Sequence, residues 1–234
     1  MELLKVEFLK IKKSSLLFTA LAVPIAIVLI FIKKAQGLAV NGLEINEAII
    51  MFSSITFIAL VLPLLNTFAA CIITKVENDN NGWKQLMLMP IKKSSIYFTK
   101  YKIMLLTLAA SIVSYLLAVI LGGFFISKKI DLSILVVGIE IFITSLPVII
   151  LLFIIGRNFM SIIPVISAGV VMMITNIFIA QSRFWIYAPW TYALSITNGA
   201  ISSYEKYIAI GASLVLAFLL FALDYISFKE SDIM

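Results

Sequence analysis

The chain has 234 residues, of which 62% are hydrophobic and 13% are charged, and its formal net charge is +6. A soluble domain of this size could not cover that much apolar surface with polar groups, so a water-soluble globular protein is excluded. The apolar residues form long blocks rather than short alternating strands, which favours a polytopic helical membrane protein over a β-barrel.

Two residue types limit the chemistry available to the chain. It has no histidine and a single cysteine, Cys71, which lies in an apolar run. A disulfide framework and a thiolate metal cluster are therefore excluded, and the commonest zinc and haem ligand is missing. We expect no metal site and no cofactor bound by this chain.

Six apolar segments are long enough to cross a hydrocarbon core of roughly 30 Å as helices. No small-residue cleavage site follows the first of them, so we expect it to be retained as a span. Prolines inside four of the spans predict kinks that neighbouring helices can accommodate. The predicted spans are residues 15–32, 48–74, 103–127, 132–156, 158–182 and 207–228, and the prolines are Pro24, Pro63, Pro147 and Pro164.

The lysines and arginines of the connecting segments indicate the orientation of these spans. If the N-terminus lies inside the cell, twelve of the 18 basic residues fall in inner segments and six in outer loops. Basic residues favour the cytoplasmic side, so both termini are predicted to be cytoplasmic. Contact of these residues with anionic lipid accounts for the net charge, and no nucleic-acid partner is expected.

The polar segment NDNNGWKQLMLMPIKKSS, residues 78–95, separates the second and third spans and falls on the cytoplasmic side. Asn and Asp residues can cap a short helix over 78–89 in which Trp83, Leu86 and Met87 share one face, and Pro90 ends it. Such a helix can lie in the lipid headgroups with Trp83 in the aromatic belt. Alternatively, it docks in a groove on a cytosolic protein and transmits that protein's motion to the second and third spans.

Glu140 is predicted to lie well inside the fourth span, where a carboxylate is costly and indicates a function. We expect no lysine or arginine at its depth, so that it is protonated or hydrogen-bonded to neutral groups such as Asn66, Thr67 and Asn176. Three roles are open for it: a structural or subunit-interface role, contact with a cationic cargo, or exposure in a water-filled cleft.

The longest outer loop, residues 183–206, carries Trp185, Tyr187, Trp190 and Tyr192 close together. Aromatic side chains at this density are typical of the belt that anchors a membrane protein at the lipid–water interface.

Three stretches of the chain resemble parts of the type-2 ATP-binding-cassette (ABC) exporter permeases. The pattern E-x₄-G-x₃-L-x₃-P-x-K-x₃-I-x₃-K is similar to their coupling-helix region. The opening MELLKVEFLKIKKSS resembles the amphipathic interfacial helix that begins such permeases, here over residues 1–14. YAPWTYAL at 187–194 resembles the aromatic–proline element of their lantibiotic-immunity branch. The fixed positions of the coupling-helix pattern are Glu77, Gly82, Leu86, Pro90, Lys92, Ile96 and Lys100.

The resemblance implies a single all-α permease domain over residues 1–234 in the bacterial cytoplasmic membrane. Such a chain is a transport subunit and not an enzyme. It would bind a cytosolic ATPase that carries ATP-Mg, and a second permease, identical or related, would complete the pathway. The absence of a GxxxxGK phosphate loop agrees with ATP hydrolysis in a separate partner.

The resemblance also implies site residues and a cargo. The cargo in this branch is an amphiphilic antimicrobial peptide expelled from the membrane, and the 183–206 loop would be a re-entrant element at the outer mouth. The residues expected to couple to the ATPase are Glu77, Gly82, Trp83, Lys84, Leu86, Met87 and Pro90, with Glu77 and Lys84 at the edge of the contact. The residues expected along the substrate pathway are Glu140, Trp185, Trp190 and Tyr192.

Other functions remain open at the level of sequence. The cargo could be a self-produced cytolytic peptide or a lipid-like drug, or the chain could be a membrane immunity protein that acts without ATP. A secondary transporter usually shows broken spans in matching halves, which this chain lacks apart from the echo IKKSSLLFT and IKKSSIYFT. An intramembrane enzyme would need a positioned base or metal, for which a histidine-free chain offers little.

Overall fold

The computed structural model describes residues 7, 15–38, 45–79, 82–83, 85, 92–127, 132–159, 161–198 and 201–230. Within these ranges the chain is helical and contains no β-strand, which confirms the predicted all-α fold. The helices are α2 (Leu16–Leu38), α3 (Ile45–Thr56), the π-helix η2 (Phe57–Val61), α4 (Leu62–Asn78), α6 (Lys93–Ser127), α7 (Ser133–Asn158), α8 (Ile163–Ile179), the 3₁₀ helices η4 (Trp185–Tyr187) and η5 (Pro189–Thr191), α9 (Tyr192–Thr197) and α10 (Ser203–Glu230).

Five stretches of the described helices are long and apolar enough to cross a membrane, as expected of a multi-pass membrane protein. The segment predicted as the fifth span forms only the shorter apolar helix α8, whose 17 residues extend about 25 Å. A count of six spans therefore stays a prediction. The five stretches are Leu16–Lys34, Ile49–Asn78, Lys93–Ile126, Ser133–Asn158 and Ser203–Glu230.

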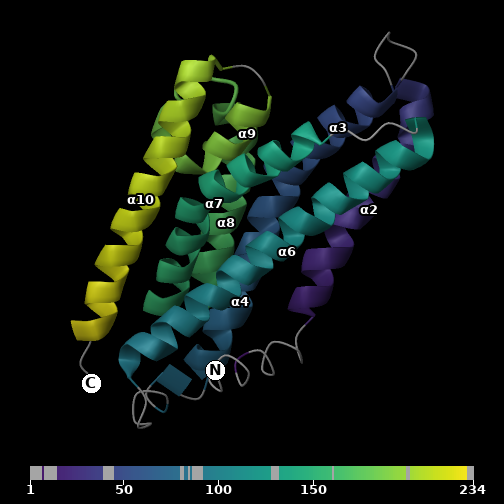
Figure 1. Cartoon of the computed structure of the whole chain (residues 1–234). Helices are drawn as coiled ribbons and strands as arrows, with labels where there is room; N and C mark the ends of the chain where they lie inside the picture. The colour runs from purple at the N-terminus through teal and green to yellow at the C-terminus, as the bar shows by residue number, and fades with distance from the viewer. Residues whose placement is uncertain are drawn as a thin grey trace.

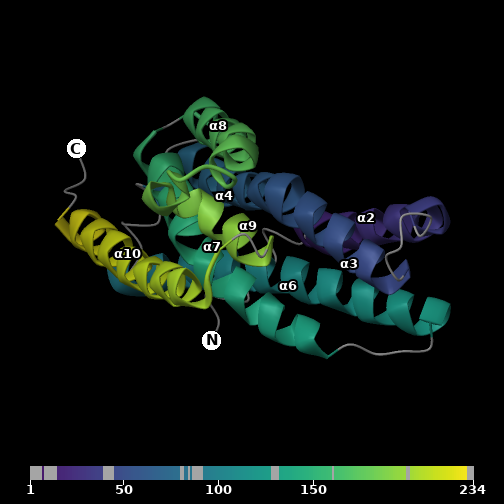
Figure 2. The same cartoon turned by 90° about the horizontal axis from the view of Figure 1, so that it is seen from above.

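The helices form one elongated bundle (Figure 1). At the lower end of the view, α4 ends, α6 begins, and α7 and α10 end; at the upper end, α2 and α6 end and α10 begins. α4 packs against α6, α7 and α8, while α10 packs mainly on α7 and α2 mainly on α6. Seen from above, α2, α3 and α6 extend to one side and α10 lies on the other (Figure 2).

The second span is a continuous helical path through α3, η2 and α4, and it contains a π turn at its middle. Pro63 lies directly after this turn, at the start of α4. A proline ring clashes with the carbonyl four residues earlier in an α-helix, and the wider π turn at Phe57–Val61 relieves this clash. The predicted irregularity at Pro63 is therefore a π turn inside a helix that continues.

Two glycines allow α4 to lie unusually close to its neighbours. A Cβ at Gly156 of α7 would come within 2.7 Å of the Thr74 side chain, and a Cβ at Gly169 of α8 would overlap the Thr67 side chain. Thr67 and Thr74 each donate a hydrogen bond to a carbonyl of their own helix, so both threonines are held on α4. Small residues at such contacts let helix backbones approach closely.

Candidate functional site at the lower end of the bundle

A buried lysine lies at the centre of the lower end of the bundle. The Lys100 side chain is only 1% exposed, and its Nζ lies 2.5 Å from Glu77 Oε1 and 2.7 Å from Glu7 Oε2. Both glutamates are also buried. A charge removed from water is tolerated only when it is paired and hydrogen-bonded, as it is here. We call these three residues the Lys100 cluster.

The Lys100 cluster joins three segments that are distant in the sequence. Glu77 is in the last turn of α4, Lys100 is in the second turn of α6, and Glu7 comes from the N-terminal segment. The Lys100 ammonium also lies 5.8 Å from the centroid of the Trp83 ring, in a cation–π arrangement. A Cβ at Gly82 would come within 2.9 Å of the Glu77 carbonyl, so only glycine lets the chain pass this close to the end of α4.

Asn78 and Trp83 attach the start of the 78–89 segment to other helices. Asn78 Nδ2 donates to the carbonyls of Gly156 (3.1 Å) and Phe159 (2.8 Å), at the end of α7. Asn78 Oδ1 accepts a 2.8 Å hydrogen bond from Trp83 Nε1. The Trp83 ring packs on Phe228 of α10 in a T-shaped arrangement, with centroids 5.9 Å apart. The amide and the indole thus connect α4, α7 and α10.

A second ion pair, with side chains 9% and 1% exposed, lies beside Phe228. Arg157, in the last turn of α7, donates to Asp224 Oδ1 of α10 from Nε (3.1 Å) and Nη2 (2.6 Å). The other oxygen of Asp224 accepts from the hydroxyls of Tyr97 (2.8 Å) and Tyr101 (3.2 Å) of α6. The guanidinium also lies 5.6 Å from the centroid of the Phe228 ring. We call Asp224, Arg157, Tyr97 and Tyr101 the Asp224 cluster.

The two clusters together form a polar base that connects α4, α6, α7 and α10. Within each cluster, charges of opposite sign are joined by hydrogen bonds, and charge-assisted hydrogen bonds of this kind are short and directional. Because the Trp83 ring contacts both Phe228 and Lys100, a displacement of Trp83 would move both of these side chains. Among the described residues, no group of three or more acidic or cysteine side chains could hold a metal ion. The arrangement is suited to transmitting a displacement between helices.

The predicted ATPase-coupling residues fall into two groups. Lys84, Leu86, Met87 and Pro90 lie outside the described residues, as does most of the predicted 1–14 helix. Glu77, expected at the edge of a partner contact, is instead 2% exposed and bound to Lys100. Trp83, expected to face a partner, is half-buried; its N–H donates to Asn78 and its ring packs on Phe228. Both residues therefore make their contacts within the bundle, and their part in ATPase coupling stays a prediction.

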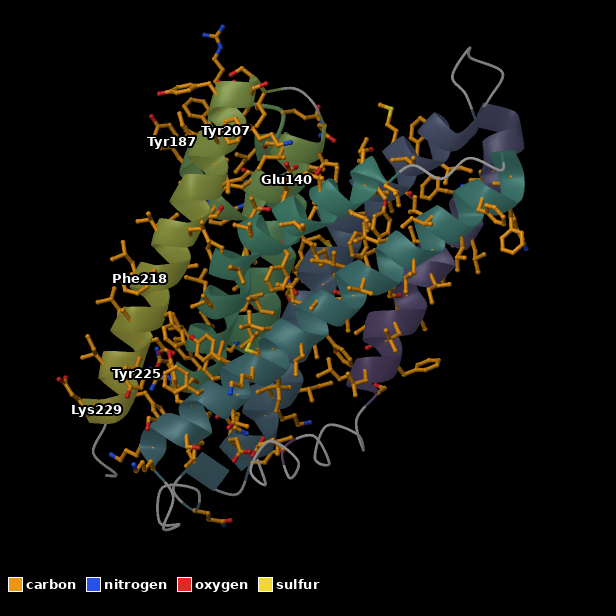
Figure 3. All side chains as sticks on the ribbon, in the orientation of Figure 1. Glu140, Tyr187, Tyr207, Phe218, Tyr225 and Lys229 are labelled. Atoms are coloured by element: carbon orange, nitrogen blue, oxygen red, sulfur yellow. The ribbon has the colours of Figure 1, made fainter. Side chains whose placement is uncertain are left out.

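Glu140 has a charged partner, contrary to the neutral environment expected from the sequence. Its Oε1 lies 2.7 Å from Lys206 Nζ, and its side chain is 13% exposed. The first turn of α10 is fixed because Glu205 Oε2 accepts from the Ser202 backbone N–H and hydroxyl, a capping box that places Lys206 on the helix. Since α10 packs on α7, the long lysine side chain reaches Glu140 near the upper end (Figure 3).

Two of the three neutral groups expected around Glu140, Asn176 and Thr67, have hydrogen-bond partners of their own. Asn176 of α8 donates a 3.4 Å hydrogen bond to the carbonyl of Ile58, in the π turn of the second span. Thr67 donates to the carbonyl of Pro63 on its own helix. These contacts stabilise the interior of the bundle and leave Glu140 to its ion pair with Lys206.

Three of the six aromatic side chains of residues 183–206 pack among the helices, and the other three, Phe184, Tyr187 and Tyr204, are exposed. Trp185 packs edge-on against Tyr192, and the Tyr192 hydroxyl donates a 2.6 Å hydrogen bond to the Ile186 carbonyl. Burial raises the pKa of this hydroxyl, which therefore stays protonated. Trp190 Nε1 donates to Thr175 Oγ1 of α8 at 3.1 Å. Tyr187 is 80% exposed and lies at the upper end of the bundle (Figure 3).

The segment therefore folds back on the bundle, because η5 and α9 both contact α7. Trp185 and Tyr192 lie in the protein interior, whereas the exposed Phe184, Tyr187 and Tyr204 leave the aromatic belt a prediction. A re-entrant position in the membrane stays a prediction.

The residues that sequence reasoning missed are those of the Asp224 cluster and the pairing of Lys100. Asp224 lies within the predicted last span, where an acidic residue indicates a buried partner. The sequence does not show which helix supplies that partner. Arg157 and Asp224 are 67 residues apart, and Glu7 and Lys100 are 93 residues apart. Only the packing of the helices brings these groups together.

Comparison with known proteins gives one family. The model of the ABC-2 family transporter proteins matches residues 3–176, which include the Lys100 cluster and all the predicted ATPase-coupling residues. No curated protein and no solved structure matches the chain.

Proposed function

The chain belongs to the ABC-2 family of transporter proteins, which makes it a membrane permease of an ABC transporter, and we propose that it expels amphiphilic antimicrobial peptides. The family implies an ATPase partner for this permease. In our proposal the ATPase docks on the 78–89 segment from the cytoplasm, and a second permease completes the pathway.

The attachment of Trp83 supports this role for the 78–89 segment. The indole is hydrogen-bonded to Asn78, packed on Phe228 and placed beside the Lys100 ammonium. An interfacial helix that lies only in the lipid headgroups does not require such contacts with α4, α6 and α10. A partner that presses on Leu86 and Met87 would instead displace Trp83, and through it the lower ends of these helices.

The site residues divide into two tasks in this proposal. Lys84, Leu86 and Met87 contact the ATPase, and Pro90 ends the helix that presents them. Glu77, Gly82 and Trp83 act as positioning residues that hold this helix to the bundle. At the upper end, Trp185, Trp190 and Tyr192 shape the wall next to which the cargo leaves, and the Glu140–Lys206 pair holds α10 against α7 there.

The peptide cargo is supported by two features of the chain. The element YAPWTYAL is similar to one found in the lantibiotic-immunity branch, and here it forms a folded aromatic wall at the upper end. In the membrane-spanning parts of α2 and α10 only 22% of the residues are buried within the protein. Their apolar faces are therefore available to lipid, to a second permease and to an amphiphile.

Leu86→Asp tests the docking claim. A charge on the apolar face of the helix should abolish co-purification of the ATPase from native membranes, while the permease still inserts. The matched control is Leu132→Asp, the same change at an exposed position at the upper end. Normal recovery of the ATPase with Leu86→Asp would refute docking at this segment.

A sensitivity panel tests the cargo. Cells that lack the permease should become more sensitive to cationic amphiphilic peptides, and the wild-type chain should restore protection only with an ATPase able to hydrolyse ATP. Protection that persists with an inactive ATPase would instead indicate an immunity protein that acts without ATP.

A further inference from the structure

A small cavity lies where α4, α7 and α8 pack against one another, and these helices can be followed in the view from above (Figure 2). Ile58, in the π turn of the second span, and Pro63, just after it, line the cavity together with Met172 of α8. Its volume is about 20 Å³. A buried water molecule needs roughly 10–15 Å³ of such free space, so the cavity is large enough for one water molecule and too small for an organic ligand.

Polar side chains of two helices also line this cavity, namely Asn66 of α4 and Thr144 and Ser145 of α7. Asn66 is 3% exposed and Ser145 is 4% exposed. Among the described residues, neither the Asn66 amide nor the Ser145 hydroxyl has a hydrogen-bond partner, yet their polar atoms remain open to a water-sized ligand. The side-chain oxygen of Asn176 is different, because it is fully enclosed. Since a buried polar group without a partner is unfavourable, Asn66 and Ser145 require a ligand between the two helices.

The chemistry of these two groups matches water. An amide has two N–H donors and an acceptor oxygen, and a hydroxyl both donates and accepts, as does a water molecule. The Thr144 hydroxyl already donates to the Glu140 carbonyl at 2.7 Å, which leaves Asn66 and Ser145 as the groups in need of a partner. Two to four polar partners are sufficient to hold a buried water. None of the described lining residues is charged, so a cation would lose its hydration without gaining a counter-charge.

A second cavity of about 200 Å³ adjoins the first and shares Val148, Met172 and Trp190 with it. All of its described lining residues are apolar. Apolar cavities stay dry, so water is expected only on the side of Asn66 and Ser145. A water beside Met172 therefore reports on the small polar cavity.

We propose that the small cavity holds one ordered water molecule that hydrogen-bonds to Asn66 of α4 and to Ser145 of α7. A bond through water is nearly as favourable in enthalpy as a direct hydrogen bond, so the water strengthens the contact between the second span and α7. The site lies within one permease chain and does not involve the 78–89 segment. It therefore stands independently of how the ATPase docks and of which peptide is exported.

Radiolytic hydroxyl-radical footprinting of the purified full-length permease tests the proposal, because X-rays convert a bound water into a radical that oxidises the side chains beside it. Met172 lines the cavity and is 7% exposed, whereas Met104 is 1% exposed and is not one of the lining residues. We expect oxidation of Met172 and no oxidation above background at Met104. Background oxidation of both methionines would overturn the proposal.

Variants of the two polar residues locate the water. Asn66→Leu replaces the amide with an apolar side chain of similar size and should reduce the oxidation of Met172 to the level of Met104. Ser145→Ala, a smaller change that serves if Asn66→Leu does not fold, should also reduce it. Ser213→Ala is the matched control, because this buried serine of α10 donates to a carbonyl of its own helix and should leave Met172 oxidation unchanged. Unchanged oxidation of Met172 in the folded variants of Asn66 or Ser145 would assign the radical to another water and reject the site.

A double-mutant cycle tests the bridge without radiolysis. Asn66 and Ser145 do not bond to each other, so without a bridging ligand their effects on the unfolding midpoint should add. If one water joins them, the double variant loses the bridge only once, and its midpoint should lie about 2–4 °C above the additive value, the shift expected for one hydrogen bond in a chain of this size. Asn66→Leu combined with Ser213→Ala should be additive. Additive midpoints in both cycles would contradict the bridge.

Discussion

Lys100→Met is the sharpest perturbation of the lower end of the bundle. Methionine keeps most of the side-chain volume but removes the ammonium between Glu7 and Glu77. Breaking a buried ion pair by removing one partner costs about 3–5 kcal/mol, because the remaining charge stays buried without compensation. Here two carboxylates lose their partner together, so we expect a loss at the upper end of that range.

The distances support this magnitude. The two carboxylate oxygens lie 2.7 and 2.5 Å from the same nitrogen, so they are about 5 Å apart at most. Two like charges about 5 Å apart repel by about 3 kcal/mol at an effective dielectric constant near 20. In the wild type the ammonium offsets this repulsion. Its removal should lower the unfolding midpoint by roughly 10 °C in a chain of this size.

Thermal unfolding of the purified permease in detergent, followed by loss of the gel-filtration peak, measures this effect. Lys102→Met is the matched control, because Lys102 is exposed on the same helix and its replacement should change stability by about 0.5 kcal/mol or less. Adding Glu7→Gln and Glu77→Gln to Lys100→Met should restore part of the loss, since it removes the unpaired charges. Equal midpoints for Lys100→Met and Lys102→Met would refute the buried-cluster argument.

Three further predictions follow from other contacts. Asp224→Asn should destabilise the permease by about 3 kcal/mol in the same thermal assay, because it leaves the Arg157 guanidinium, whose side chain is only 9% exposed, without its counter-charge. Gly169→Ala should destabilise it by about 1–3 kcal/mol through overpacking against α4, whereas Gly211→Ala, with no neighbouring atom within 4 Å, should not. Glu140→Lys should weaken peptide protection in the sensitivity panel, and the swap that adds Lys206→Glu should restore it if the pair is structural.

Each of these predictions has an outcome that would contradict it. For Asp224→Asn the control is Glu230→Gln, at an exposed position of the same helix, and equal stability of the two would remove the cluster from the account. For Gly169→Ala, relief by Thr67→Ala is required, because Thr67 supplies the clashing atoms. For the charge swap, restored stability without restored protection would assign Glu140 to contact with a cationic cargo.

Hydropathy located the helices well because apolar length alone decides whether a segment can span a membrane. Its errors lie where charged residues are buried in protein. α6 begins at Lys93, ten residues before the predicted span, since Lys100 is neutralised inside the bundle and does not mark an aqueous boundary. The π turn before Pro63 also escaped prediction, because helix periodicity does not distinguish one widened turn from an α-helix.

The candidate site was less predictable than the helices. The position of Trp83 on an amphipathic segment was evident, but the direction of its ring depends on Asn78 and Phe228, which only packing brings to it. The partner of Glu140 was missed because Lys206 was counted as a loop residue, whereas the capping box at Ser202 places it in α10. Ion pairs between residues 66 or more positions apart require a tertiary structure to be seen.

Photocrosslinking in living cells from position 86 tests the central claim most directly. A benzophenone amino acid placed at Leu86 should crosslink to an ATPase, because the account puts this position on the contact surface in the cytoplasm. The same amino acid at Leu132, exposed at the opposite end, should not. Crosslinks from position 86 to lipid alone, or an ATPase adduct only from position 132, would contradict the account.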